Sequence, residues 1–177
     1  LAAALAGAQG TLRVGYAGKR VRSVGVGNGL KALIALANRH DLIVLEDTPY
    51  RHIRFAGQDL PTLKSLDTEG RVIHLGSFSK ILVPGMRIGW AVANPDLLSR
   101  MGQLKVAADT QTSTLNMAAA SLFLDRYDLN AHITTLRAAY ATKKEAMLDA
   151  IRRHFPQEIM ATDPQGGLFT WLTFPEG

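Results

Sequence analysis

The sequence predicts an α/β fold in which helices cover a mixed, mostly parallel sheet. The 177 residues are 47% hydrophobic and 20% charged, a composition that favours a packed domain over a disordered chain. Apolar runs of strand length at 42–45 and 72–75 are each followed by a polar segment. A helix, a strand, a polar turn, a strand, a polar loop and a further strand then follow one another, which is typical of an α/β layer.

The N-terminal part contains one helix with clear periodicity. Composition predicts a helix over 1–8 and a short strand over 11–14. Residues 15–29 contain five glycines, no acidic residue and no clear period, so we expect a loop there. The segment 30–39 is predicted to be a helix because its apolar residues share one face. These residues are Leu30, Leu33, Ile34 and Ala37.

Three strands are predicted in the middle of the chain, at 42–45, 72–75 and 88–93. The first is a continuous apolar run, which favours a strand that is buried on both faces, as in a parallel sheet, and the second is also expected to be buried. Between them, the segment 58–70 is loop-like and has room for one short helix.

The C-terminal part is predicted to be mainly helical. Asn94 followed by proline is a helix start signal, and this helix is expected over 95–108. Further helices are expected over 115–124 and over 128–155, where apolar residues recur three, four or seven positions apart. The run 168–174 is strand-like. We expect the large apolar side chains of these segments in the core, among them Trp90, Met147, Phe155 and Trp171.

Composition and charge argue against several classes of function. The net charge is +5, but the basic residues are scattered, so direct nucleic-acid binding is not favoured. The absence of cysteine excludes a disulfide framework and a catalytic thiol, and it fits a reducing compartment without proving one. The five histidines lack metal-binding spacing, so no metal is expected. No apolar stretch reaches the roughly 18 residues of a membrane helix.

Polar side chains follow two of the predicted strands, in the turn at 46–50 and in the loop at 76–84. In open α/β sheets, ligands bind at the carboxyl ends of the strands, so these two segments predict a ligand site. The candidate residues are Asp47, Tyr50, Ser77, Ser79, Lys80 and Arg87.

These residue types suit pyridoxal 5'-phosphate (PLP). A lysine amine forms a Schiff base with an aldehyde, and a carboxylate keeps a pyridine nitrogen protonated. A phenol can donate to the ring oxygen, while hydroxyls and a guanidinium hold a phosphate. Plainer interpretations exist. Lys80 could be a solvated charge, and Arg87 could be the partner of a surface carboxylate. Asp47 and Tyr50 could cap a turn. The combination at two strand ends favours the cofactor site.

The sequence resembles the class I/II aminotransferases of PLP fold type I. The most specific pattern is S-x-S-K-x6-R with D-x-x-Y upstream. The resemblance covers about 30–177 and, more loosely, 1–14. It looks closest to the 2-aminoadipate aminotransferase branch and to the aminotransferase-like domains of GntR/MocR-type regulators. It is carried by LEDTPY (45–50), GSFSK (76–80), PGMRIG (84–89), NPD (94–96), 112–116 and PQGGLFTW (164–171).

The resemblance implies a role for each candidate residue. Lys80 would form a Schiff base with the cofactor and then move a proton between the substrate α-carbon and the cofactor. Asp47 would pair with the pyridine nitrogen, and Tyr50 would hydrogen-bond the phenolic oxygen. The residues expected to contact the phosphate are Ser77, Ser79 and Arg87.

The resemblance also implies a piece of a larger protein. Residues 1–108 would be the back half of the large PLP-binding domain, 109–155 the interdomain helices, and 156–177 the beginning of a truncated small domain. An upstream phosphate turn, a ring-stacking aromatic and a C-terminal substrate-binding arginine of the family have no counterpart in the sequence. The N-P-x-G motif expected within 15–29 is also absent, which indicates a divergent loop or a local reading-frame error.

The expected function is ping-pong transfer of an amino group between an amino acid, such as 2-aminoadipate or a related one, and a 2-oxo acid. The resemblance implies a cytoplasmic homodimer that does not contact a membrane. The alternative is the effector-sensing domain of a MocR-type transcription regulator, in which nucleic acid is bound only through an upstream domain. A third interpretation is a remnant that keeps the motifs but does not fold.

Overall fold

The computed structural model describes residues 11–12, 15–16, 19–20 and 24–175, and the helix predicted over 1–8 lies outside them. The described residues form two compact units, and each unit is considered by itself. The first unit lies within 1–49 and 60–127, and the second lies within 50–59 and 128–177. The domain boundaries expected after residues 108 and 155 remain predictions.

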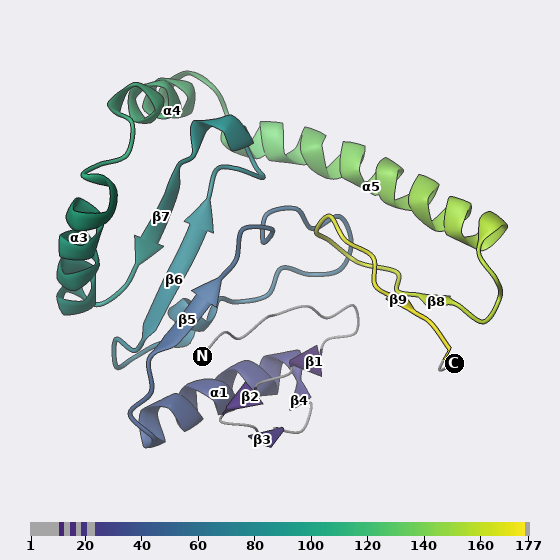
Figure 1. Ribbon diagram of the computed structural model, residues 1–177, viewed down its shortest axis with the longest axis horizontal. Helices are drawn as coiled ribbons and strands as arrows, with labels where there is room; N and C mark the ends of the chain where they lie inside the picture. Colours follow the sequence, from purple (N-terminus) through teal and green to yellow (C-terminus); the bar gives the residue numbers. More distant parts are fainter. Residues whose placement is uncertain (1–10, 13–14, 17–18, 21–23, 176–177) are drawn as a thin grey trace. The chain divides into compact units, whose positions relative to one another are not determined.

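A three-stranded mixed sheet forms the centre of the first unit (Figure 1). The strands β5 (Val44–Asp47), β6 (Val72–Ser77) and β7 (Gly89–Val92) lie side by side in this order. β5 and β6 are parallel, whereas β6 and β7 are antiparallel. All three predicted strands are therefore confirmed, and the first two end later in the chain than expected.

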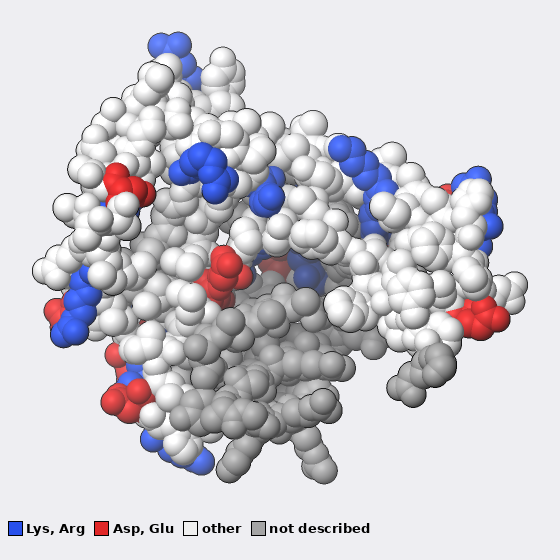
Figure 2. Space-filling model, viewed as in Figure 1, with Lys and Arg blue, Asp and Glu red and all other residues white. Residues whose placement is uncertain are grey.

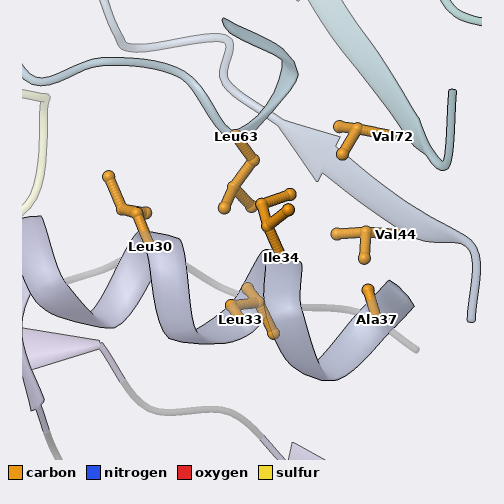
Figure 3. Close-up of a cluster of buried hydrophobic side chains, with 7 residues drawn as sticks. All are labelled: Leu30, Leu33, Ile34, Ala37, Val44, Leu63 and Val72. Atoms are coloured by element: carbon orange, nitrogen blue, oxygen red, sulfur yellow. The ribbon is translucent and has the colours of Figure 1, made fainter. Parts of the chain in front are cut away.

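One face of this sheet carries the core of the first unit. The helix α1 (Val26–Arg39) packs with its predicted apolar face against the sheet, and the short helix α2 (Leu63–Leu66) completes the cluster. Burial of one such aliphatic side chain stabilises the fold by about 1.5–3 kcal/mol. Figure 3 shows the cluster, which consists of Leu30, Leu33, Ile34, Ala37, Val44, Leu63 and Val72.

The prediction that the first strand is buried on both faces is wrong for the described residues. Ile43 is 46% exposed and Leu45 is 39% exposed, whereas Val44 is buried. The reason is that α1 and α2 contact the sheet through the side chains of one face only. Glu46, which we expected in a turn, lies inside the strand and is 3% exposed.

The prediction of a loop over 15–29 is also wrong in part. The segment contains three two-residue strands: β2 (Gly15–Tyr16), β3 (Lys19–Arg20) and β4 (Val24–Gly25). β2 pairs with β3, and β4 pairs with β1 (Thr11–Leu12). Such short ladders consist of backbone hydrogen bonds and need no side-chain period, so the sequence pattern did not indicate them. The following helix α1 begins at Val26, four residues before the predicted start at Leu30.

The helices of the first unit after the sheet agree with their predictions. The helix α3 (Pro95–Asp109) begins after Asn94, whose side chain accepts a hydrogen bond from the backbone of Asp96 at 2.9 Å. The helix α4 (Thr114–Arg126) follows, and Ser113 caps its first turn. These caps satisfy backbone donors that would otherwise lack a partner at the helix start.

The second unit consists of the long helix α5 (Leu129–His154), the segment 50–59 and the short strands β8 (Met160–Ala161) and β9 (Leu172–Thr173). The predicted helix over 128–155 is confirmed, whereas only part of the predicted strand over 168–174 forms. Buried apolar residues of this unit are Ile53, Ile133, Leu148 and Ile151.

Three residues that we expected in the core are exposed in the second unit. Trp171 is 71% exposed, and Met147 and Phe155 are also exposed. The described part of this unit supplies one short segment and one two-stranded hairpin, which cover only part of the long helix. Apolar character alone therefore overestimates burial here.

The distribution of charged side chains on the surface does not change the interpretation of the net charge that was made from the sequence. On the face drawn in Figure 2, Lys and Arg side chains lie at several separate places, some of them beside Asp and Glu side chains. Among the described residues, no helix combines the length and the apolar character that are needed to cross a membrane.

The Asp67 carboxylate joins α2 to the start of β6. It accepts hydrogen bonds from the backbone N–H groups of Arg71 and Val72, both at 3.0 Å, and from Lys64 Nζ at 2.9 Å. Burial alone would raise the pKa of Asp67, but these hydrogen bonds and the Lys64 charge outweigh burial and hold the pKa at about 2.

We expect Asp67→Asn to lower the free energy of unfolding at neutral pH. The full shift corresponds to about 2.5 kcal/mol, which solvent screening reduces to about 1 kcal/mol. Because the folded-state pKa lies below the unfolded-state value, this stabilisation is complete above about pH 4 and is lost as the pH falls toward 2. Urea unfolding of both proteins across this range tests the expectation, with Asp109→Asn in the exposed Lys105 pair as control. Equal stability at neutral pH would contradict it.

Candidate active site

The parallel pairing of β5 and β6 brings two predicted site residues to the same edge of the sheet. Asp47 is the last residue of β5 and is in register with Leu75, and Ser77 is the last residue of β6. Parallel strands present their carboxyl ends at one edge, where ligands bind in open α/β sheets. The exposed Asp47 side chain therefore lies on a strand next to the one that leads to Ser77 and Lys80.

The end of β6 and its connection to β7 carry four of the candidate residues. The Ser77 hydroxyl donates to the Ile88 carbonyl at 3.4 Å and accepts from the Ser79 backbone N–H at 3.0 Å. The chain then makes a tight turn, in which Leu82 N–H donates to the Phe78 carbonyl at 2.8 Å. The partly exposed Lys80 lies within this turn and directly before the buried Ile81, which anchors the turn.

Arg87 lies in the same connection, at the end of the 3-10 turn η1 (Pro84–Met86). Its backbone is left-handed, with a φ of 53°, which costs a residue other than glycine about 1 kcal/mol. The exposed guanidinium donates to the Pro84 carbonyl at 3.3 Å. Strained backbone of this kind clusters at ligand sites, which agrees with the predicted role of Arg87.

Close packing between β6 and β7 fixes the start of this connection. Gly76 is in register with Trp90, and a Cβ atom at Gly76 would come within 3.0 Å of the indole ring. The indole also lies against Phe78, with ring centroids 4.9 Å apart. Only glycine leaves space for Trp90 at this position, one residue before Ser77.

A residue of α4 holds the other end of the connection. The Asn116 side-chain amide donates to the Met86 carbonyl at 3.0 Å, directly before Arg87. The stretch 112–116 contributed to the family resemblance, but no sequence pattern indicated this contact, which joins residues thirty positions apart.

Tyr50 belongs to the second unit, unlike the other five candidates. Its ring packs edge-to-face against Phe169, with ring centroids 5.4 Å apart, and its carbonyl accepts from the Ile53 backbone. The structure therefore brings together Asp47, Ser77, Ser79, Lys80 and Arg87 in one unit, and Tyr50 is described only within its own unit.

Two charged residues of the site, Asp47 and Arg87, have no ion-pair partner among the described residues. Within the described part of the chain, the Asp47 carboxylate also caps no turn. The plainer interpretations of these two residues are therefore not favoured. The site presents one carboxylate, two hydroxyls, one amine and one guanidinium on two adjacent strand ends.

Sequence reasoning missed a polar cluster around the buried Glu46 side chain, next to the site. Glu46, His74 and Thr48 lie in contact across β5 and β6. We expected Glu46 and Thr48 in a turn and His74 to be structural or solvated. The one available signal was an acidic residue directly after an apolar run, because a buried carboxylate requires hydrogen-bond partners.

We expect Gly76→Ala to destabilise the first unit by about 1–3 kcal/mol, because the added methyl group collides with the Trp90 indole. The tryptophan near-ultraviolet circular dichroism should change with it. The double variant Gly76→Ala with Trp90→Leu should recover much of the lost stability. A Gly76→Ala protein as stable as the wild type would contradict the close packing.

Comparison with known proteins identifies the family. The model of the family aminotransferase class I and II matches residues 28–177. The aromatic-amino-acid aminotransferase 1 of Thermococcus litoralis is 40% identical over 147 residues, which are 83% of this chain and 35% of the relative. The 2-aminoadipate transaminase of Thermus thermophilus is 38% identical, over 83% of this chain and 38% of the relative. The regulator NorG of Staphylococcus aureus is 31% identical, over 81% of this chain and 32% of the relative.

Solved structures agree with this result. The kynurenine aminotransferase of Pyrococcus horikoshii, in complex with PMP, superposes with a TM-score of 0.80 at 41% identity, over 85% of this chain and 37% of that protein. The α-aminoadipate aminotransferase of Thermus thermophilus, complexed with N-(5'-phosphopyridoxyl)-L-leucine, superposes with a TM-score of 0.80 at 37% identity. The match covers 85% of this chain and 39% of that protein.

The chain thus spans between about a third and two fifths of the length of these proteins. The superpositions confirm the predicted α/β fold of the PLP fold type I transferases. Since the family model covers nearly the whole described chain, the protein belongs to the class I and II aminotransferases.

Proposed function

We propose that this chain forms part of a PLP-dependent aminotransferase that transfers an amino group between an amino acid and a 2-oxo acid. Family membership makes pyridoxal 5'-phosphate the cofactor. The observation that carries the proposal is the arrangement of four candidate residues at the end of β6 and in the connection to β7, with Asp47 at the adjacent strand end.

The donor set fits the cofactor. Two hydroxyls and a guanidinium without a carboxylate partner among the described residues suit a dianionic phosphate. The Asp47 carboxylate, which is exposed at the strand end, suits a protonated ring nitrogen. The site thus offers a positive charge for the phosphate at one place and a negative charge for the ring at another. A ligand with an anionic end and a cationic ring requires both.

Each candidate residue would have a distinct role toward the cofactor or the substrate. When bound, PLP supplies an aldehyde that holds the amino group of the substrate and a ring that takes up electrons from the α-carbon. The Lys80 amine would hold the cofactor and, once displaced by the substrate, would move a proton between the substrate α-carbon and the cofactor. Asp47 holds the proton on the ring nitrogen. Ser77, Ser79 and Arg87 bind and orient the phosphate, and Tyr50 is proposed to hydrogen-bond the ring oxygen.

The relatives narrow the proposed substrates. Their names refer to aromatic amino acids, 2-aminoadipate and kynurenine, so we propose 2-aminoadipate or a related amino acid as the donor. A regulatory role is not favoured, because NorG is less similar than the enzymes. The homodimer and the cytoplasmic location expected from the resemblance remain part of this proposal.

The proposal predicts that Lys80 alone attaches PLP. Purified chain mixed with PLP should show a visible absorption band, and borohydride should fix the cofactor on Lys80, as peptide mass spectrometry would show. Lys80→Ala should lose the band with little change in its free energy of unfolding. Lys143→Ala removes another lysine and serves as the matched control. An equal band in Lys80→Ala, or labelling spread over many lysines, would overturn the assignment.

A second prediction concerns Arg87. Arg87→Ala should weaken PLP binding about 10- to 100-fold, because hydrogen bonds to a charged group are lost. Binding of pyridoxal, which lacks the phosphate, should stay the same. Arg100→Ala removes an exposed arginine from α3 and should bind both compounds as the wild type does. Equal losses of PLP and pyridoxal binding in Arg87→Ala would show that Arg87 does not act on the phosphate.

A further inference from the structure

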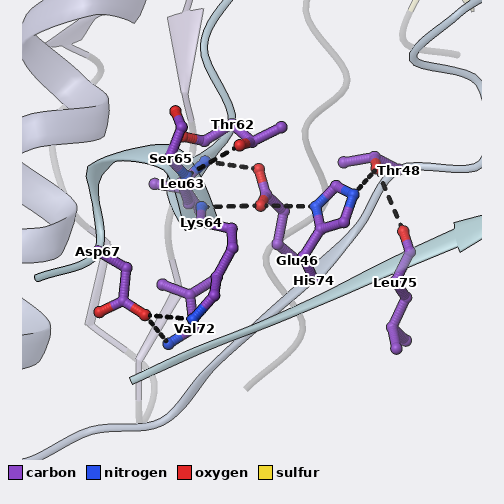
Figure 4. Close-up of polar contacts among 10 residues, drawn as sticks. All are labelled: Glu46, Thr48, Thr62, Leu63, Lys64, Ser65, Asp67, Val72, His74 and Leu75. Atoms are coloured by element: carbon purple, nitrogen blue, oxygen red, sulfur yellow. Dashed lines mark hydrogen bonds and ion pairs between the residues drawn. The ribbon is translucent and has the colours of Figure 1, made fainter. Parts of the chain in front are cut away.

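A buried carboxylate lies next to the candidate site. Glu46 accepts hydrogen bonds from the backbone N–H groups of Leu63 at 2.7 Å and Lys64 at 3.1 Å, at the start of α2. Its Oε2 atom also lies 2.9 Å from Nδ1 of His74, the residue in register with it on β6 (Figure 4). All three contacts act on a side chain that is almost fully buried, so its position is closely fixed.

The contact with Glu46 also fixes the His74 ring. Both Glu46 oxygens accept hydrogen bonds from backbone N–H groups, so the proton of the contact with His74 is assigned to Nδ1. The other ring nitrogen, Nε2, then faces Thr48, whose Oγ1 atom lies 3.5 Å away. The contact with Glu46 thus orients the ring so that its Nε2 edge lies against Thr48.

Thr48 is in turn bound twice to β6. Its backbone N–H donates to the Leu75 carbonyl at 3.1 Å, and its hydroxyl donates to the same carbonyl at 3.2 Å. The ladder of β5 and β6 ends at the pair of Asp47 and Leu75, so these contacts extend the attachment one residue beyond the ladder. Figure 4 shows the continuous series of contacts from α2 through Glu46 and His74 to Thr48.

Asp47 lies between the two anchored residues. Side chains alternate along a strand, so Glu46 points into the buried face while Asp47 is exposed on the other face. The network holds the backbone on both sides of Asp47. His74 belongs to the same strand as Ser77, so the network also ties Asp47 to the segment that leads to Lys80.

Stability alone is a weak explanation for this network. Two positions earlier on the same face, the side chains of Val44 and Val72 are buried as an apolar pair that needs no side-chain hydrogen bond. A similar apolar pair in place of Glu46 and His74 would avoid the cost of burying a carboxylate. Hydrogen bonds add direction, because they hold one register and one ring orientation.

We propose that Glu46, His74 and Thr48 are positioning residues that set the Asp47 carboxylate against the ring nitrogen of PLP. This inference rests on the proposed function. It predicts that the variants lose the interaction with the ring nitrogen and keep the interaction with the phosphate.

The test compares PLP with its deaza analogue, in which a carbon replaces the ring nitrogen, on the purified protein. Asp47→Asn defines the full loss of preference for PLP over the analogue. His74→Phe should lower the affinity for PLP about fivefold, the equivalent of one net hydrogen bond, and leave the affinity for the analogue unchanged. Thr48→Val should act in the same direction. His74→Phe combined with Asp47→Asn should bind PLP no more weakly than Asp47→Asn alone.

Controls separate positioning from stability. Val44→Ala weakens the same strand pair without touching the network, so it should leave the preference for PLP over the analogue unchanged while lowering the free energy of unfolding. His74→Asn can keep the donor to Glu46, and His74→Gln can keep a donor near Thr48. These two variants test the proposal if His74→Phe fails to fold. Each should lose part of the preference for PLP over the analogue.

The outcomes distinguish the two proposals. Wild-type protein that does not bind PLP, or that binds both compounds alike, would overturn the proposed function and the inference with it. The inference alone would be overturned by a different result. In that case the wild-type protein prefers PLP over the analogue and Asp47→Asn loses this preference, but all His74 variants and Thr48→Val keep it.

Discussion

The parallel register of β5 and β6 is the constraint on which the rest of the structure depends. It pairs Val44 with Val72 at one end, where α1 and α2 bury both side chains, and Asp47 with Leu75 at the other end. A shift of one residue would turn every side chain of β5 to the opposite face, which would expose Val44 and bury the Asp47 carboxylate. Burial at the apolar end therefore sets the geometry of the polar end, and the fold and the candidate site depend on the same pairing.

The second requirement is a rigid connection after β6. The Trp90 indole occupies the space above Gly76, Ile81 is buried below the turn, and Asn116 holds the carbonyl before Arg87. These contacts come from a strand, a turn and a helix, so no single local motif defines the connection. A lysine that must both attach a cofactor and move a proton needs such a fixed support, because small misplacements cost much of the rate.

The sequence predicted what local chemistry determines. The start signal at Asn94 and the apolar period over 128–155 placed two long helices to within one or two residues, and the residue types after two strands indicated the site. The sequence did not predict what depends on partners far along the chain. Glu46 resembles a turn residue until the backbone of Leu63 and the ring of His74 are placed beside it. Trp171 resembles a core residue because its type does not reveal how much chain covers it.

The central claim is that two strand ends hold one cofactor between a carboxylate and a lysine. A crystal structure of the protein with PLP fixed by borohydride tests it most directly. The account predicts continuous electron density from Lys80 Nζ into the cofactor, with the Asp47 carboxylate within hydrogen-bond distance of the ring nitrogen and the phosphate beside Ser77 and Arg87. Density that joins the cofactor to another lysine, or a phosphate bound away from the β6–β7 connection, would contradict the account.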